Sequence, residues 1–191
     1  MTPKTFAITG TGRCGTRFLS EHMNKSKVWT VLHEPKSPAP QERFRQSCYG
    51  EVNSELIHDP EVFLNLEVGK KGIIFRDSTT LLTSIFNRRP VSEQTFYVDK
   101  IVGIYSMFDD WLEQHPDWVR IQFEDMVSDR DYLAHVFDVF GIEDLNVKNI
   151  DLNAKVNASK SNRFQSMADW PVETRKHFEN SKLSQYSRLT E

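Results

Sequence analysis

The stretch that most constrains the fold is residues 5–19, in which a buried strand, a glycine-rich turn and a helix follow one another. Phe6-Ala7-Ile8 is a short apolar run suited to a buried parallel strand. Gly10, Gly12 and Gly15 then permit backbone angles and close approaches that side chains forbid. Such a turn presents free N–H groups and the positive end of the helix dipole, so it predicts an anion site.

Two arginines within this turn, Arg13 and Arg17, favour anion binding over a tight structural turn without a ligand. A nucleoside triphosphate loop needs the pattern Gly-x-x-x-x-Gly-Lys-Ser/Thr. Gly10 and Gly15 have that spacing, but Thr16 stands in the place of the lysine. Arg17 stands in the place of the hydroxyl that binds magnesium. The stretch is therefore a poor ATPase loop.

The turn resembles the 5′-phosphosulfate loop of the sulfotransferases that use 3′-phosphoadenosine-5′-phosphosulfate (PAPS). The core of that loop is a basic residue, serine or glycine, glycine and threonine, and here it reads Arg13-Cys14-Gly15-Thr16. Cys14 replaces the more usual serine, which removes one hydroxyl contact to the 5′-phosphate. The resemblance implies that Arg13 stabilises charge on the leaving phosphate, and that Arg17 either joins the site or points to solvent. The residues that it assigns to the nucleotide here are Gly12, Arg13, Cys14, Gly15, Thr16 and Arg17.

A second point of resemblance follows the apolar strand expected over residues 72–75. In sulfotransferases a strand ends in Arg-Asp, and the arginine and a serine eight residues later bind the 3′-phosphate of the nucleotide. Arg76 and Ser84 have this spacing. The family often has proline after the aspartate, where this chain has Ser78, which we expect to cap a helix over residues 79–87.

The strand expected over residues 28–32 ends at His33-Glu34-Pro35. If this strand neighbours the first one, His33 and Glu34 lie beside the glycine turn; otherwise they are a solvated strand end. Some sulfotransferase branches use a glutamate at the end of the second strand as the general base, and Glu34 holds that position. Cytosolic members use histidine, which makes His33 the rival. Adjacent extended residues point to opposite sides, so we expect only one to reach the acceptor and favour Glu34.

The remaining pattern is less specific. Residues 36–70 are expected to be a substrate-side insertion or a cover for the sheet, with short helices at 41–49 and 61–67. Phe123-Glu124-Asp125 matches an aromatic-Glu-Asp sequence of the family, and we expect these carboxylates to be structural. Further elements are expected at residues 92–115 (helix), 118–123 (strand), 132–140 (helix, capped by Ser128 or Asp129 and ended by Gly141) and 171–180 (helix). The expected core of the long helix is Phe96, Ile101, Ile104, Met107, Phe108, Trp111 and Leu112.

Residues 153–165 carry cations among small polar residues. Sulfotransferases have a basic loop here that closes over the phosphates of the nucleotide. The resemblance therefore assigns Lys160 and Arg163 to nucleotide binding, although an exposed basic loop explains them equally well.

Composition limits the classes of function. Of the 191 residues, 38% are hydrophobic and 27% are charged, which indicates a soluble globular protein. The net charge of −3 argues against non-specific nucleic-acid binding. Two cysteines provide neither a disulfide framework nor a metal cluster. Because Met1 leads almost directly into the first strand, we expect no signal peptide and no membrane span, and hence a cytoplasmic location.

Together these observations predict one domain over residues 1–191, of the α/β class. We expect a three-layer, P-loop-like fold with a parallel sheet of about four or five strands and helices on both faces. The resemblance implies transfer of a sulfuryl group from the co-substrate PAPS, without a metal, to a hydroxyl or amine of a small-molecule, sugar or lipid acceptor, which releases 3′,5′-ADP. The alternatives are an ATP-dependent small-molecule kinase and a non-catalytic nucleotide-binding module.

Overall fold

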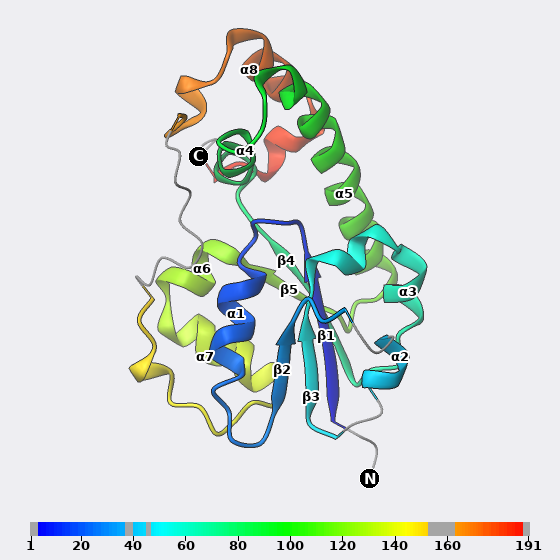
Figure 1. Ribbon diagram of the computed structural model, residues 1–191. Coiled ribbons are helices and arrows are strands. Elements are labelled where there is room, and N and C mark those ends of the chain that lie inside the picture. The colour runs from blue at the N-terminus through cyan, green and yellow to red at the C-terminus, as the bar shows by residue number, and fades with distance from the viewer. Residues whose placement is uncertain (1–3, 37–39, 45–46, 153–162, 189–191) are drawn as a thin grey trace. The chain divides into compact units, whose positions relative to one another are not determined.

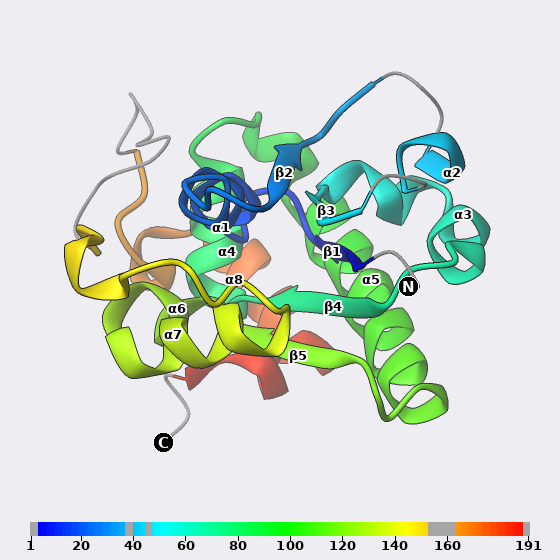
Figure 2. The ribbon, with the colours of Figure 1, turned by 90° about the horizontal axis from the view of Figure 1, so that it is seen from below.

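The buried run near the start of the chain forms the central strand of a parallel sheet. The computed structural model describes residues 4–36, 40–44, 47–152 and 163–188. All five strands are parallel, and their order across the sheet is β2-β3-β1-β4-β5, which Figure 2 shows from one end. Their bounds are β1 Thr5–Gly10, β2 Thr30–His33, β3 Tyr49–Val52, β4 Lys70–Phe75 and β5 Val119–Gln122.

The chain folds into two compact units. Unit 1 comprises residues 1–75 and 115–156, and unit 2 comprises residues 76–114 and 157–191. Besides the sheet, the described part of unit 1 contains α1 (Thr16–Met23), α2 (Pro40–Arg43), η1 (Ser54–His58), α3 (Pro60–Asn65), α6 (Phe123–Ser128), α7 (Arg130–Val139) and η3 (Val147–Asn149). The elements of unit 2 are α4 (Ser78–Phe86), η2 (Val91–Glu93), α5 (Gln94–Gln114), η4 (Met167–Asp169), α8 (Val172–Glu179) and η5 (Lys182–Tyr186).

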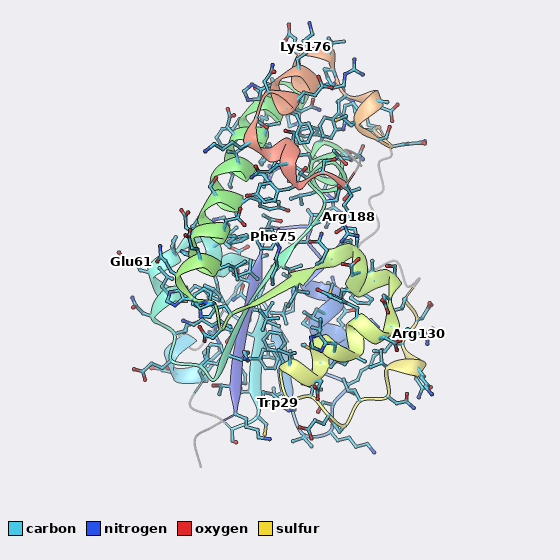
Figure 3. The ribbon with its side chains drawn as sticks, turned by 180° about the vertical axis from the view of Figure 1, so that it is seen from behind. Trp29, Glu61, Phe75, Arg130, Lys176 and Arg188 are labelled. Carbon is cyan, nitrogen blue, oxygen red and sulfur yellow. The ribbon has the colours of Figure 1, made fainter. Side chains whose placement is uncertain are left out.

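Helices cover both faces of the sheet within unit 1 (Figure 1). On the face that bears Phe6 and Ile8, the strands pack against buried side chains of α1 and α7. Gly50 of β3 is required there, because an added Cβ would lie 2.1 Å from the ring of Phe6. Trp29 closes the amino end of this core, at the opposite end of the sheet from Phe75 (Figure 3), and its indole N–H donates to the carbonyl of Gly141 at 3.0 Å.

The other face of the sheet carries charged groups that are buried with their partners. Arg43 of α2 forms a bidentate ion pair with Glu51 of β3, and the hydroxyl of Tyr49 donates to the same carboxylate at 2.8 Å. Lys71 of β4 donates to the carbonyl of Leu64 at 2.7 Å, and its ammonium lies 4.9 Å from the ring centroid of Trp118. Burial lowers the pKa of Lys71. Pairing therefore offsets the cost of burying these charges.

Unit 2 is helical in its described residues and has an aromatic core. The ring centroid of Trp170 lies 4.9 Å from that of Phe86 on α4 and 5.5 Å from that of Phe178 on α8. The indole N–H of Trp170 donates to the hydroxyl of Thr83 at 3.1 Å. The hydroxyl of Thr174 on α8 donates to the side-chain oxygen of Gln94 on α5 at 3.1 Å. These contacts join the last segment of the chain to α4 and α5.

The α/β class, the five-stranded parallel sheet and the helices on both faces are as predicted. One strand was missed. The expected helix over residues 41–49 is wrong, since α2 ends at Arg43 and β3 begins at Tyr49. Residues 36–70 thus contribute the strand β3 to the sheet. Because β3 lies between β1 and β2, the condition that the strand before His33 neighbours the first strand is not met.

Two local predictions in unit 2 are corrected. The N-cap of α4 is Asp77, whose carboxylate accepts from the amide of Thr80 at 2.8 Å, and Ser78 is the first helical residue. Phe96 was expected in the core of α5 but is 61% exposed. The fully buried tyrosine of that helix, Tyr105, was not predicted. The elements over 132–140 and 171–180 are present as α7 and α8, and the expected strand at 118–123 is β5.

Candidate functional site

The carboxyl ends of β1, β2 and β3 form the part of unit 1 where a ligand is expected. The connection that follows β1 places α1 on one face of the sheet, and the connection that follows β3 places α3 on the other. In open α/β sheets, ligands bind where neighbouring strands send their connections to opposite faces. The loop after β1, Thr11–Gly15, lies at this position.

The backbone of this loop has two left-handed residues. Arg13 has a φ of +77° and Gly15 has a φ of +90°, while the amide of Cys14 donates to the carbonyl of Thr11 at 3.3 Å. Gly15 caps α1, whose first turn contains no acidic residue. The amides of that first turn lie at the positive end of the helix dipole, where an anion is favoured.

Glycine is required at the last position of the loop for a second reason. An added Cβ on Gly15 would lie 2.5 Å from the ring of Phe123, the first residue of α6. The aromatic residue of the Phe-Glu-Asp sequence thus packs against the loop. Glu124 accepts from the side-chain amide of Gln122 at 2.6 Å. Gly12 is exposed, and an added Cβ there would meet nothing within 4 Å.

Cys14 and Thr11 are the buried side chains of the loop. Cys14 is fully buried among the apolar residues between the sheet and α1, and its sulfur lies 2.5 Å from the position of a Cβ built on Gly10. Its side chain is thus a core group, and its backbone remains part of the loop. Thr11 is 1% exposed, and its hydroxyl has no hydrogen-bond partner among the described residues. A buried hydroxyl without a protein partner is a group that a ligand or an ordered water molecule commonly satisfies.

The other predicted loop residues differ in their surroundings. Thr16 is buried, and its hydroxyl oxygen lies 3.2 Å from Nε2 of His33. Arg13 is half-buried. Arg17 is exposed and forms an ion pair with Glu21 one turn along α1, with 2.6 Å between Nε and Oε1. This contact lies on the solvent side of α1 and fits the alternative that Arg17 points to solvent.

His33 and Glu34 come together, contrary to the expectation that they point to opposite sides. Glu34 has a φ of +48°, so the chain turns at this residue and does not continue as a strand. Nε2 of His33 lies 3.5 Å from Oε1 of Glu34. The hydroxyl of Ser54 donates to the same carboxylate oxygen. Ser54 is the first residue of η1 and follows the unpredicted strand β3. Thr16, His33, Glu34 and Ser54, which we call the edge cluster, therefore join α1 to the ends of β2 and β3.

Arg76 and Ser84 belong to unit 2. The amide of Arg76 donates to the hydroxyl of Tyr105 at 3.2 Å, and that hydroxyl donates to the carbonyl of Arg76 at 2.6 Å. Nε of Arg76 donates to the hydroxyl of Thr80 at 3.2 Å. Ser84 is half-buried on α4. A tyrosine at an inward position of an amphipathic helix is the only sequence signal for the contact between Tyr105 and Arg76.

Comparison of the sequence with models of known protein families and with curated proteins finds no match.

Lys160, one of the two predicted residues of the basic loop, lies outside the described residues. Arg163 is exposed, and its guanidinium carbon lies 5.1 Å from the ring centroid of Phe164. In the described parts of the chain, no group of three or more histidine, cysteine, aspartate or glutamate side chains could hold a metal ion. The same parts contain no helix long and apolar enough to cross a membrane.

Proposed function

We propose that the chain is a sulfotransferase that moves a sulfuryl group from PAPS to a hydroxyl or amine of an acceptor. The observation that carries the proposal is the contact between Thr16 of the loop and His33 of the edge cluster, at 3.2 Å. It puts a candidate base and a candidate anion site within one hydrogen bond of each other. The loop also lacks the lysine that a nucleoside triphosphate site requires.

The residues of the loop suit the phosphosulfate end of the donor. Amides at the start of α1 and the hydroxyl of Thr16 would hold the 5′-phosphate. The unsatisfied hydroxyl of Thr11 is a further donor in the same loop. Arg13 would stabilise the charge that builds on the phosphate oxygen as the bond to sulfur breaks, and loss of one such donor typically slows a reaction by roughly 10²–10³. The resemblance assigns the 3′-phosphate to Arg76 and Ser84.

The edge cluster would supply the base. PAPS, when bound, supplies the sulfuryl group, and its bridging S–O bond breaks as the acceptor oxygen bonds to sulfur. The proton of the acceptor hydroxyl passes to Glu34, and 3′,5′-ADP leaves. A positioned base contributes typically 10²–10⁴-fold to such a step. His33 remains the rival base, because its Nε2 lies 3.5 Å from Oε1 of Glu34.

The choice of ligand tests the proposal. We expect 3′,5′-ADP to raise the melting temperature without magnesium, and ATP with magnesium to raise it much less. A ligand at about 100 times its Kd adds about 2.7 kcal/mol. That corresponds to roughly 5–10 °C for a chain of this size. An equal or larger shift with ATP that requires magnesium would favour the kinase, and binding of 3′,5′-ADP without turnover of PAPS would favour a non-catalytic module.

Substitution of Arg76 tests the 3′-phosphate assignment in the same assay. Arg76→Ala should weaken binding of 3′,5′-ADP by about 1.5–3 kcal/mol, the range of a charge-assisted hydrogen bond. AMP, which lacks the 3′-phosphate, should bind the variant and the parent alike. Arg89→Ala is the matched control, since Arg89 is exposed and packs over the ring of Tyr97. If AMP and 3′,5′-ADP lose affinity equally, Arg76 is a structural residue.

A further inference from the structure

Within the described parts of the chain, one oxygen of the Glu34 carboxylate has protein partners and the other has none. Oε1 accepts from the hydroxyl of Ser54 and lies 3.5 Å from Nε2 of His33. Among the residues that the structure describes, Oε2 has no hydrogen-bond partner. The side chain of Glu34 is 31% exposed, so this second oxygen belongs to a group that a substrate can reach. The two oxygens of this carboxylate are therefore not equivalent.

Ser54 is itself held in place by the central strand. The preceding residue, Asn53, donates its amide to the carbonyl of Ile8 at 2.8 Å and accepts at its carbonyl from the hydroxyl of Thr9 at 3.0 Å. The side chain of Asn53 also accepts from the amide of Glu55 at 2.9 Å, which begins η1. Ser54 is 7% exposed. Its hydroxyl is thus fixed relative to β1, which leads directly into the anion loop.

His33 connects the same carboxylate oxygen to the loop. Its Nε2 lies 3.2 Å from the hydroxyl of Thr16 and 3.5 Å from Oε1 of Glu34. When the Thr16 hydroxyl donates to a bound anion, its oxygen can accept from Nε2–H of His33. The hydroxyl of Ser54 then keeps Oε1 of Glu34 in place, whether His33 donates to Thr16 or to Glu34.

We infer that Ser54 is a positioning residue that fixes the Glu34 carboxylate, with Oε1 against His33 and Oε2 turned to the acceptor as the basic oxygen. This inference rests on the proposed function, because the acceptor proton is the one that Oε2 takes up. It adds Ser54, the first residue of η1, which follows the unpredicted strand β3, to the machinery of the site. Without the Ser54 hydroxyl the carboxylate can rotate, and both contacts of Oε1 are lost.

Turnover of PAPS with water as the acceptor provides the kinetic test. Ser54→Ala should lower kcat for release of 3′,5′-ADP by about tenfold to a hundredfold, as expected when a catalytic group is misplaced. The KM for PAPS and the affinity for 3′,5′-ADP should stay within about threefold, because the phosphate contacts are unchanged. Ser54→Thr keeps the hydroxyl and should restore kcat. Ser92→Ala, at an exposed serine of η2, is the control.

A spectroscopic measurement separates this inference from the proposed function. In the imidazole ¹⁵N spectrum, Ser54→Ala should move the His33 signals, Glu34→Gln should move them similarly, and Ser54→Thr should leave them in place. If the parent chain fails to turn over PAPS, the proposed function fails, and the His33 spectrum still decides whether Ser54 holds Glu34. Unchanged His33 signals in Ser54→Ala, or an unchanged kcat in that variant, would overturn the inference.

Discussion

Arg13 of unit 1 and Arg76 of unit 2 are held by different means. In unit 1, Arg13 lies in a loop whose shape comes from left-handed backbone at Arg13 itself and at Gly15. In unit 2, the backbone of Arg76 is bonded on both sides to one hydroxyl, that of Tyr105, which lies 29 positions further along the sequence. The backbone conformation of the loop therefore depends on residues within the loop. The position of the Arg76 backbone depends instead on Tyr105, a residue of α5.

This difference determines which substitutions each region tolerates. A residue within the loop can disturb it directly, through a forbidden φ or a clash. The backbone at Arg76 is sensitive to Tyr105 and to the neighbouring cap residue Asp77, which also accepts from the amide of Arg188 at 2.6 Å.

The largest effect is expected for Gly15→Ala in the loop. A left-handed φ costs a residue with a Cβ about 1–2 kcal/mol. The clash with the ring of Phe123 adds about 1–3 kcal/mol. We therefore expect the free energy of unfolding to fall by about 2–5 kcal/mol, measured by urea denaturation, together with loss of 3′,5′-ADP binding.

Gly12→Ala is the matched control in the same loop, because Gly12 has open space around its Cβ position. Its free energy of unfolding should stay within about 0.5 kcal/mol of the parent value. Equal destabilisation by Gly12→Ala and Gly15→Ala would show that the left-handed backbone does not determine the shape of the loop.

A smaller effect is expected for Tyr105→Phe in unit 2. The substitution keeps the buried ring but leaves the amide and the carbonyl of Arg76 without this partner, which costs about 1–3 kcal/mol. Urea denaturation should show this loss, and the affinity for 3′,5′-ADP should fall while the affinity for AMP does not. Tyr97→Phe is the control, since the ring of Tyr97 packs against Arg89 and is half-buried. If both variants behave alike, the Tyr105 hydroxyl does not hold the turn.

The smallest effect, of opposite sign, is expected for Gly103→Ala. Gly103 lies in the interior of α5, is exposed, and has nothing within 4 Å of an added Cβ. Alanine at such a position stabilises a helix by about 0.5–1 kcal/mol. A rise in the melting temperature would show that this glycine, unlike Gly15, has no conformational role. A fall would mean that α5 needs the freedom of glycine at this point.

The sequence predicted the strands that read as apolar runs. β1 and β4 have such runs, and every residue of β1 is buried. β3 reads Tyr-Gly-Glu-Val, which contains a glycine and a charge where a central strand usually has branched apolar residues. Gly50 makes room for Phe6, and Glu51 is neutralised by Arg43. Both reasons lie in tertiary contacts, which a local pattern does not contain.

The candidate site was predicted in part for the same reason. The glycines and Arg13 of the loop predict an anion site. The glycines can be recognised in the sequence because a left-handed or closely packed backbone position favours that residue. The meeting of His33 and Glu34 depends on a left-handed φ at a glutamate, for which the sequence has no signal. Ser54 was missed because it follows the unpredicted β3.

The division of the chain between the two units has a consequence for synthesis. The chain leaves unit 1 after Phe75, returns to it at His115, and enters unit 2 again after residue 156. A ribosome that has made residues 1–152 has supplied every strand of the sheet, together with α1, α6 and α7. It has not yet made Trp170 and Phe178, on which the aromatic core of unit 2 depends. During translation Phe86 of α4 therefore lacks its partner ring, Trp170, until the last segment of the chain has been made, whereas the strands of the sheet are supplied earlier.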